Sequence, residues 1–428
     1  MTLSWLSIVR LGFVQMALGA IVVLMTSTLN RLMVVELALP AVLPGLLVAL
    51  HYGIQITRPN WGFLSDTGGN RTLWIVGGMG VLALGGLLAA FGVVVLETQF
   101  LLGMGISIVA YALIGLGVGA SGTSLLALLA TATAPRRRAA AATITWLMMI
   151  AGIAITAGTV GVFLEPYSPM LLMEIVAIVT GGAFIVTVLA TLGIERGVVV
   201  EREPDPMPFR DGLREVWCET KARHFTVFVF LAMTAYFMQE LILEPYAGLV
   251  FGFTPGQSTS LSGAQNGGVF IGMLLVGIAA TGFKFGALRH WVVAGCLGSA
   301  ASLTIISLIG SNPEAFPLVP AVVLLGIFNG MFAVAAIGSM MALAAQGREA
   351  REGTRMGLWG AAQAMAAGFG GLLGAALVDI LRGITADAPA FGTVFLIEAV
   401  LFIAAAVMAA RIMEDYRQRP LAPMVPGE

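Results

Sequence analysis

Acidic and amide side chains occur in a part of the chain that is otherwise apolar enough to cross a membrane. Gln239, Glu240, Glu244 and Pro245 all fall within the apolar run 224–250. Ionisable groups in hydrocarbon are costly and usually face a partner or a cavity. Since Glu240 and Glu244 are four residues apart, a helix places both on one face, and Pro245 favours a kink beside them. These residues are therefore candidates for a gate or a binding site.

A basic residue with polar neighbours, Arg31, lies near the end of the first apolar run. Asn30 precedes it and Glu36 follows it. At about 1.5 Å per residue, Arg31 and Glu240 lie at similar depths along their helices. If the two helices face each other, Arg31 pairs with Glu240 or Glu244 and closes the outer side of a cavity. A structural ion pair and solvated outer helix ends are the alternatives.

A second polar face is predicted within the apolar run 41–59. His51 and Gln55 lie one helical turn apart there, and Asn329 lies in a later run. A neutral imidazole is a good axial ligand for the magnesium of a chlorin, and it can also relay protons. Polar side chains in membrane helices more often hydrogen-bond a neighbouring helix, so both interpretations remain open for all three residues. The same two interpretations apply to Gln265, Asn266, Gln363 and Glu398.

Motifs that would indicate an enzyme are missing. A nucleotide-binding P-loop needs a lysine after a glycine, but Lys221 and Lys284 follow Thr220 and Phe283. The GxGxxG match at 117–122 lies inside an apolar run without a preceding strand, which favours close helix packing over dinucleotide binding. No two aspartates have the DxxD or DxxxD spacing that holds Mg²⁺ against a diphosphate. We expect neither a metal site nor catalysis.

The composition is that of a membrane protein. Of the 428 residues, 58% are hydrophobic and 11% are charged, and the mean hydropathy is +0.96, which is too apolar for a water-soluble fold. The 54 glycines suit helices that associate by close backbone approach. A net charge of −1 gives no reason to expect a nucleic-acid partner. The partner that the composition predicts is the lipid bilayer.

Apolar windows of about 20 residues recur along the chain, and each is long enough to cross a bilayer. With the N-terminus inside, only Arg31 and Arg382 of the 22 basic residues fall towards the outside. We therefore expect both termini to be cytoplasmic. The predicted spans are the twelve runs 11–34, 41–59, 73–96, 100–130, 139–163, 169–192, 224–250, 260–281, 290–310, 317–345, 356–378 and 390–410.

The longest polar segment divides these spans into two sets of six. It holds six basic and seven acidic residues and three prolines, so it cannot lie in the membrane. The predicted organisation is an N-terminal half 1–192, a cytoplasmic inter-half loop 193–223, a C-terminal half 224–410 and a cytoplasmic tail 411–428.

A short polar stretch between the second and third spans contains Gly62, Leu64, Asp66, Gly69 and Arg71. Glycines allow a very tight loop between two membrane helices, while the charges stay in the aqueous interface and pair with helix ends. The pattern resembles the loop between helices 2 and 3 of the major facilitator superfamily. The resemblance implies an all-α membrane protein with 12 transmembrane helices in two six-helix halves, around a cavity lined mainly by helices 1, 4, 7 and 10.

Four stretches, 28–37, 65–67, 239–252 and 254–259, resemble the PucC family, also called the bacteriochlorophyll delivery branch of that superfamily. The similarity covers nearly the whole chain. It implies that the polar residues of the family's first helix correspond to Asn30, Arg31 and Glu36. The acids of its seventh helix correspond to Glu240 and Glu244.

The resemblance also implies a role in the inner membrane of a phototrophic bacterium, either the cytoplasmic or the intracytoplasmic photosynthetic membrane. The expected role is to assist bacteriochlorophyll biosynthesis, by binding or delivering bacteriochlorophyll or its tailed precursor. It could equally scaffold bacteriochlorophyll synthase, geranylgeranyl reductase or light-harvesting polypeptides. A proton-coupled transporter of a small solute and a subunit of a bacteriochlorophyll synthase enzyme are the alternatives. No cofactor is firmly implied, and bacteriochlorophyll is the expected ligand.

Overall fold

Helices make up every regular element in the part of the chain that the structure describes. The computed structural model describes residues 3–57, 70–134, 137–195, 217–218, 220–283, 285–345 and 352–412. The N-terminal set consists of α1 (Trp5–Val23) with its π-helical continuations η1 (Leu24–Leu29) and η2 (Leu32–Glu36), α2 (Val42–Ile54) with the short turn η3 (Gln55–Thr57), α4 (Arg71–Leu96), α5 (Phe100–Ala132), α6 (Arg138–Phe163) and α7 (Pro169–Thr191). The C-terminal set consists of α9 (Thr220–Phe251), α10 (Pro255–Val276) with η5 (Gly277–Gly282), α11 (Leu288–Ile309), α12 (Leu318–Ala345), α13 (Glu352–Arg382) and α14 (Asp387–Ile412).

Eleven helical stretches in the described residues are long and apolar enough to cross a membrane. The expected all-α membrane protein is thereby confirmed. The second predicted span is the exception, because Val42–Thr57 is a shorter apolar helix. The chain reaches it through Ala38, whose φ of 49° is left-handed, and through Pro40, which cannot donate a backbone hydrogen bond. The helix consequently begins only at Val42.

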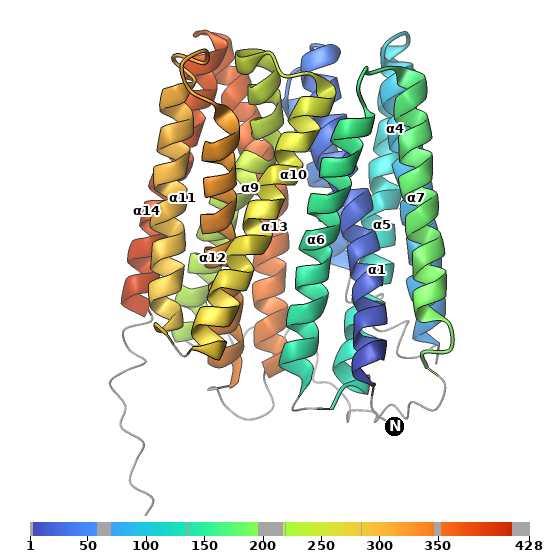
Figure 1. Cartoon of the computed structure of the whole chain (residues 1–428), viewed down its shortest axis with the longest axis vertical. Coiled ribbons are helices and arrows are strands. Elements are labelled where there is room, and N and C mark those ends of the chain that lie inside the picture. The colour runs from blue at the N-terminus through green and yellow to red at the C-terminus, as the bar shows by residue number, and fades with distance from the viewer. Residues whose placement is uncertain are drawn as a thin grey trace, which may run out of the picture.

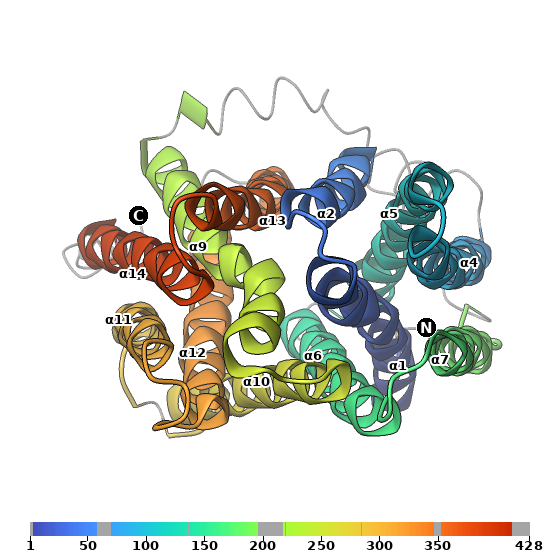
Figure 2. The same ribbon diagram turned by 90° about the horizontal axis from the view of Figure 1, so that it is seen from above.

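Each set of helices has its own hydrophobic core. The buried residues of one core run from Leu3 to Ile194, and those of the other run from Phe225 to Ala409. Leu241 of α9 is the exception, since it packs into the N-terminal core. Viewed from above, α1 and α9 lie near the centre of the bundle, while α4, α7, α11 and α14 lie at its periphery (Figure 2).

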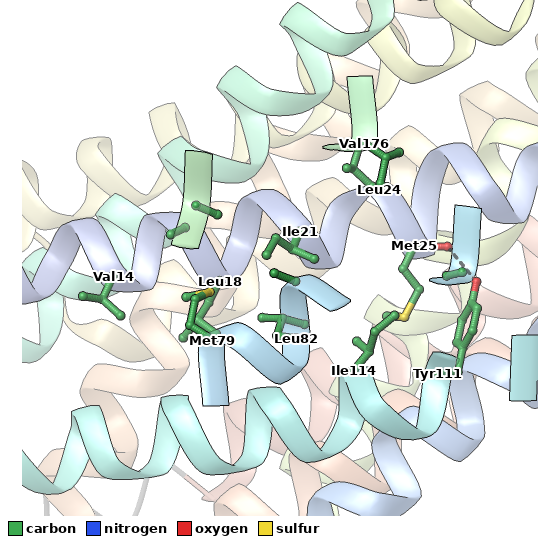
Figure 3. Packing of buried hydrophobic residues seen from close by; sticks show 14 of the residues in the cluster. Val14, Leu18, Ile21, Leu24, Met25, Met79, Leu82, Tyr111, Ile114 and Val176 are labelled. Carbon is green, nitrogen blue, oxygen red and sulfur yellow. Dashed lines mark hydrogen bonds between the residues drawn. The ribbon is translucent and has the colours of Figure 1, made fainter. Parts of the chain in front are cut away.

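Packing of α1 against its own half is tight and apolar. Leu18 and Ile21 of α1 lie against Met79 and Leu82 of α4 (Figure 3). The hydroxyl of Tyr111 on α5 donates a hydrogen bond to the carbonyl of Met25 at 3.3 Å. This bond engages a carbonyl in η1, where the regular helical pattern is interrupted.

Glycines let helices approach closely at the predicted GxGxxG run and at other places. A Cβ on Gly117 would lie 2.5 Å from the backbone nitrogen of Leu82, and one on Gly78 would lie 2.5 Å from that of Ser121. The GxGxxG run therefore packs α5 against α4, as the sequence favoured. Between the halves, a Cβ on Gly263 of α10 would lie 2.5 Å from the backbone nitrogen of Gly158 of α6.

Two seams join the halves, one between α6 and α10 and the other between α2 and α13 (Figure 2). The start of α1 and the end of α14 lie at the same end of the bundle (Figure 1). We call this the terminal end. The turns between α9 and α10 and between α13 and α14 lie at the opposite end, which the distribution of basic residues predicts to be the outer one (Figure 1).

Candidate functional site

A cavity of about 330 Å³ lies between the two halves. Its lining comes from α1, η1, α2, η3, α5 and α6 on one side and from α9, α10, α12 and α13 on the other. The four helices expected to line it, which are α1, α5, α9 and α12, all contribute, and the helices of the two seams contribute as well. Much of the wall is aromatic or sulfur-containing, from Trp146, Met149, Tyr236, Phe237 and Met273.

The polar lining is mostly carboxamide and carboxyl. It includes three residues expected at a site from the sequence, Gln239, Glu240 and Glu244, and Gln15, which was not anticipated. The Oε1 atoms of Gln15 and Gln239 and the Oε2 atom of Glu244 are buried and make no hydrogen bond within the described residues. Buried polar atoms nearly always have a partner. Some atoms outside the lining, such as Nδ2 of Asn329, also lack one in the described part of the chain, but these three belong to lining residues, so a ligand or water in the cavity can bind them. The remaining polar lining residues are Thr26, Ser27, His51, Tyr52, Gln55, Thr123, Ser262, Gln265, Asn266 and Gln363.

The two acids of α9 face the first helix, as predicted. Ser27 donates a short hydrogen bond to Oε1 of Glu244, and Thr26 lies within hydrogen-bonding reach of Glu240. Both hydroxyl residues belong to the π-helical segment η1. Such bulges are rare and occur frequently at functional sites. Composition gave no signal for this segment.

The predicted ion pair between Arg31 and an acid of α9 is wrong. Arg31 pairs with Glu36 at 2.5 Å, and it donates a second hydrogen bond to the carbonyl of Phe253 at 2.8 Å. The reason lies in the π-helical register of η2, which brings residues five apart to adjacent turns and so aligns Glu36 with Arg31. Arg31 is 2% exposed and does not line the cavity.

Arg31 nevertheless joins the two halves at the end predicted to be the outer one, because Phe253 belongs to the other half. Asn30 likewise donates to the carbonyl of Leu241 at 2.8 Å. The hydroxyls of Thr28 and Thr259 lie 3.2 Å apart across the same boundary. These contacts, which we call the closure, join η1 and η2 to the C-terminal half, and a gating role for them stays a prediction.

Two carboxylates that sequence reasoning missed complete this closure. Asp379 at the end of α13 accepts hydrogen bonds from the backbone nitrogens of Ala41 at 2.9 Å and Val42 at 2.8 Å, at the start of α2. Glu165, just after α6, accepts a hydrogen bond from the backbone nitrogen of Gly256 at 3.1 Å, at the start of α10. A carboxylate is favourable at the positive end of a helix. Each half thus caps a helix of the other half.

The loop between α6 and α7 adds a neutral side chain to this outer end. Burial, together with the negative charges of Glu97 and Glu36, raises the pKa of Tyr167 to about 12. Tyr167 therefore stays uncharged over the physiological pH range.

His51 and Gln55 lie on one face, as predicted, and both line the cavity. Nε2 of His51 lies 2.8 Å from Nε2 of Gln55. This contact engages the imidazole nitrogen, so coordination of a magnesium ion by that atom would require the contact to break. Across the cavity, the ring of Tyr52 meets that of Phe237 of α9 edge to face, with centroids 5.9 Å apart.

Asn329 lies outside the cavity. It is 0% exposed, and its Oδ1 accepts a hydrogen bond from Ser299 at 2.8 Å. It therefore holds α12 to α11, which is the structural alternative stated from the sequence. A position as a pigment ligand does not fit this burial.

Of the tight-loop motif, only Arg71 is described, and Gly62, Asp66 and Gly69 lie outside the described residues. Arg71 donates to the carbonyl of Ala127 at 3.2 Å and to the hydroxyl of Thr131. Its backbone nitrogen donates to Glu195 at 3.1 Å. These contacts tie the start of α4 to α5 and to the segment after α7.

Comparison with known proteins gives consistent results. The family model described as "PUCC protein" matches residues 28–416. The "Bacteriochlorophyll synthase 44.5 kDa chain" of Rhodobacter capsulatus is 66% identical over 414 residues, which cover 96% of each chain. "Protein PucC" of Cereibacter sphaeroides is 30% identical and covers 88% of this chain and 84% of its own length.

Solved structures confirm the fold. A bacterial homologue of the human lysosomal transporter Spinster, in an inward-facing and unoccupied conformation, superposes with a TM-score of 0.71 at 15% identity, covering 97% of this chain and 98% of its own. The nucleoside transporter NupG superposes with a TM-score of 0.70 at 13% identity, covering 95% and 99%. At these identities the likeness concerns the fold, which is that of the major facilitator superfamily.

Proposed function

The chain belongs to the PUCC protein family, and from this premise we propose that it binds bacteriochlorophyll or its tailed precursor in the cavity between its halves and hands it on during pigment synthesis or complex assembly. Membership, multi-pass topology and a relative named for bacteriochlorophyll synthesis support a role in the photosynthetic membrane. The observation that carries the proposal is the cavity itself.

The wall of this cavity suits a flat, largely apolar macrocycle, and because about 330 Å³ is smaller than a whole tailed chlorin, the proposal also requires the two halves to move apart around the ligand. Ligand sites combine apolar and aromatic walls with a few convergent polar groups, and here the aromatic and methionine side chains supply the walls. Methionine is flexible and polarisable, so it can adapt to an irregular ring system. The unpartnered oxygens of Gln15 and Gln239 supply polar groups that can orient the ring.

Access to the cavity is proposed from the terminal end. The contacts made by Asn30, Arg31, Glu165 and Asp379 across the halves lie at the outer end, whereas the lining extends along α1 as far as Gln15. A pigment made at the cytoplasmic face would therefore enter without first opening the outer contacts. Docking of bacteriochlorophyll synthase, geranylgeranyl reductase or light-harvesting polypeptides near this end would complete the transfer.

The protein is proposed to act as a carrier or scaffold rather than as a catalyst. The aspartate spacing that a diphosphate-handling transferase needs is missing from the sequence. No group of three or more metal-ligating side chains occurs among the described residues. Turnover by the purified chain alone would overturn this part of the proposal.

The test is purification in mild detergent from phototrophic cells, followed by absorption spectra and identification of bound proteins. A matched pair of variants distinguishes pigment bound in the cavity from pigment bound elsewhere. Gly122 lines the cavity, and a Cβ there has Leu18 as its nearest neighbour at 3.8 Å, so the Cβ of Gly122→Leu is accommodated and the rest of the side chain narrows the cavity. Gly181 is exposed on α7, and a Cβ added there would have no atom within 4 Å. Gly181→Leu is therefore the control.

We expect bacteriochlorophyll to copurify with the wild type and with Gly181→Leu, and its amount to fall several-fold in Gly122→Leu. Pigment-free wild-type protein without biosynthetic partners would contradict the proposed function.

A proton-coupled transporter of a small solute is the second candidate, because Glu240 and Glu244 lie in the cavity. Carboxyl groups inside a membrane bundle are typical of proton pathways. In that case Glu240→Gln abolishes uptake of the solute while cellular pigment stays at the wild-type level. Under the proposed pigment-binding function, Glu240→Gln changes the cellular pigment yield instead.

A further inference from the structure

The cavity lining has no lysine or arginine among the described residues, and its one imidazole, His51, contacts Gln55 through Nε2. Acidic and amide groups are present in the lining. The two acids, Glu240 and Glu244, supply negative charge when ionised and no positive charge when protonated. The carboxamides of Gln15, Gln239, Gln265 and the other amide residues carry no net charge.

The cation nearest to these acids along the first helix is already engaged. Nη1 of Arg31 pairs with Oε1 of Glu36 at 2.5 Å, and Nη2 donates a hydrogen bond to the carbonyl of Phe253 at 2.8 Å. It lies one turn beyond Ser27, the residue that bonds Glu244, and it is absent from the lining. Its Nε has no partner within the described residues, but because Arg31 is not part of the lining, a ligand in the cavity does not contact this guanidinium.

We infer that the cavity selects a neutral, tail-esterified chlorin and rejects anionic ligands of the same pathway. Burying a carboxylate or phosphate without a cationic partner carries a large desolvation cost. This desolvation cost applies to a chlorin whose propionate is a free acid and also to a prenyl diphosphate. An ester removes the charge and leaves only carbonyl oxygens, which amide N–H groups can satisfy.

This inference rests on the proposed function and refines it. It places the protein after the step in which the propionate is esterified with a prenyl alcohol. The class of reaction that supplies its ligand is thus an ester-forming prenyl transfer. The protein would receive the product of that reaction and would not present its acidic or diphosphate substrates.

The experiment compares two ligands that differ in charge but not in tail. The wild-type chain in nanodiscs is titrated with bacteriochlorophyllide a and with its methyl ester, and binding is followed by quenching of tryptophan fluorescence, for which Trp146 in the lining is a reporter. We expect the methyl ester to bind at least about tenfold more tightly than the free acid, because the acid leaves its charge without a partner.

A cation placed in the wall should reduce this preference. Gln265 lines the cavity from α10 and is only partly buried. We expect Gln265→Arg to improve binding of the free acid and to lower the ratio of the two dissociation constants, free acid to ester, about tenfold. Gln265→Met, of similar length without charge, should still bind the ester more tightly than the free acid. Size-exclusion profiles confirm that each variant is folded.

The outcomes separate this inference from the function on which it rests. Equal affinities, or tighter binding of the free acid by the wild type, overturn the charge selection while leaving pigment binding intact. Binding of neither ligand overturns the proposed function, and the inference with it. The comparison on the wild type stands even if Gln265→Arg fails to fold.

Discussion

The closure and the cavity differ in what their polar groups bind. At the closure, Arg31, Asp379 and Glu165 each have a counter-ion or backbone partner, and several of these partners lie in the other half. Only single atoms there, Nε of Arg31 and Oδ1 of Asn30, are buried without a partner within the described residues, and both residues hold the other half through another atom. In the cavity, buried oxygens of Gln15, Gln239 and Glu244 have no partner within the described residues. The difference indicates that the closure contributes to holding the halves together, whereas the cavity retains unused hydrogen-bonding capacity for a ligand.

Loss of Arg31 is the strongest test of this contrast. We expect Arg31→Ala to lower the stability of the protein by about 2–3 kcal/mol, because the part-buried carbonyl of Phe253 loses a charge-assisted hydrogen bond and the half-exposed carboxylate of Glu36 loses its partner. The measurement is thermal unfolding in detergent. Arg382→Ala is the control, since its pair with Asp387 is partly exposed, and its removal should cost less than about 1 kcal/mol. Equal losses of stability in the two variants would show that the contacts of Arg31 stabilise the protein no more than a partly exposed ion pair does.

Removal of the carboxylate that caps α2 should weaken the closure by a smaller amount. Asp379→Ala leaves two backbone N–H groups at the start of α2 without their acceptor, which costs about 1–2 kcal/mol. In a background where Cys218 and Cys296 are replaced, a cysteine introduced at Ala41 should react faster with an impermeant maleimide in the Asp379→Ala variant. An unchanged labelling rate would remove Asp379 from the closure.

Two amide residues, one predicted for the cavity or gate and the other as a possible pigment ligand, should behave differently from each other. Asn329→Ala removes the acceptor of buried Ser299 and should cost about 1–2 kcal/mol while pigment retention per folded protein stays normal. Gln239→Ala should lower pigment retention several-fold at a smaller cost in stability, because the Oε1 atom of Gln239 has no partner to lose. The melting temperature and the pigment-to-protein ratio are measured on both. A reversed pattern would place the ligand elsewhere.

Substitution of Glu244 should have the smallest effect on stability. We expect Glu244→Gln to change stability by less than about 1 kcal/mol, because a glutamine carbonyl still accepts the hydrogen bond from Ser27. Glu244→Leu leaves Ser27 without that acceptor and should cost more. Thermal unfolding of the two variants checks this order, and equal losses would mean that charge rather than hydrogen bonding is what matters there.

Sequence periodicity predicted the parts of the site that depend on one helix. The spacing of Glu240 and Glu244 placed both on one face, and the pairing of His51 with Gln55 followed from a single helical turn. Helical spacing failed for Arg31, because the prediction assumed α-helical geometry where η2 is π-helical. No local pattern distinguishes this register from an α-helix.

Contacts between distant segments could not be predicted in the same way. Asp379 lies in the last turn of α13 and Glu165 lies just after α6, and only the packing of the two halves brings them to the starts of α2 and α10. Asn329 and Gln239 have the same chemistry in similar apolar runs. Their different surroundings arise from which face of each helix meets the cavity, and the lengths of the runs carry no information on that.

The most direct test of the central claim uses the photochemistry of the bound pigment. The wild-type chain loaded with bacteriochlorophyll a is illuminated in air, and methionine sulfoxide is mapped by mass spectrometry. Met149 and Met273 line the cavity, whereas Met170 is 73% exposed on the outside of the bundle. A pigment in the cavity oxidises Met149 and Met273 in proportion to its occupancy and ahead of Met170. Oxidation that favours Met170 and spares the two cavity methionines would contradict the account.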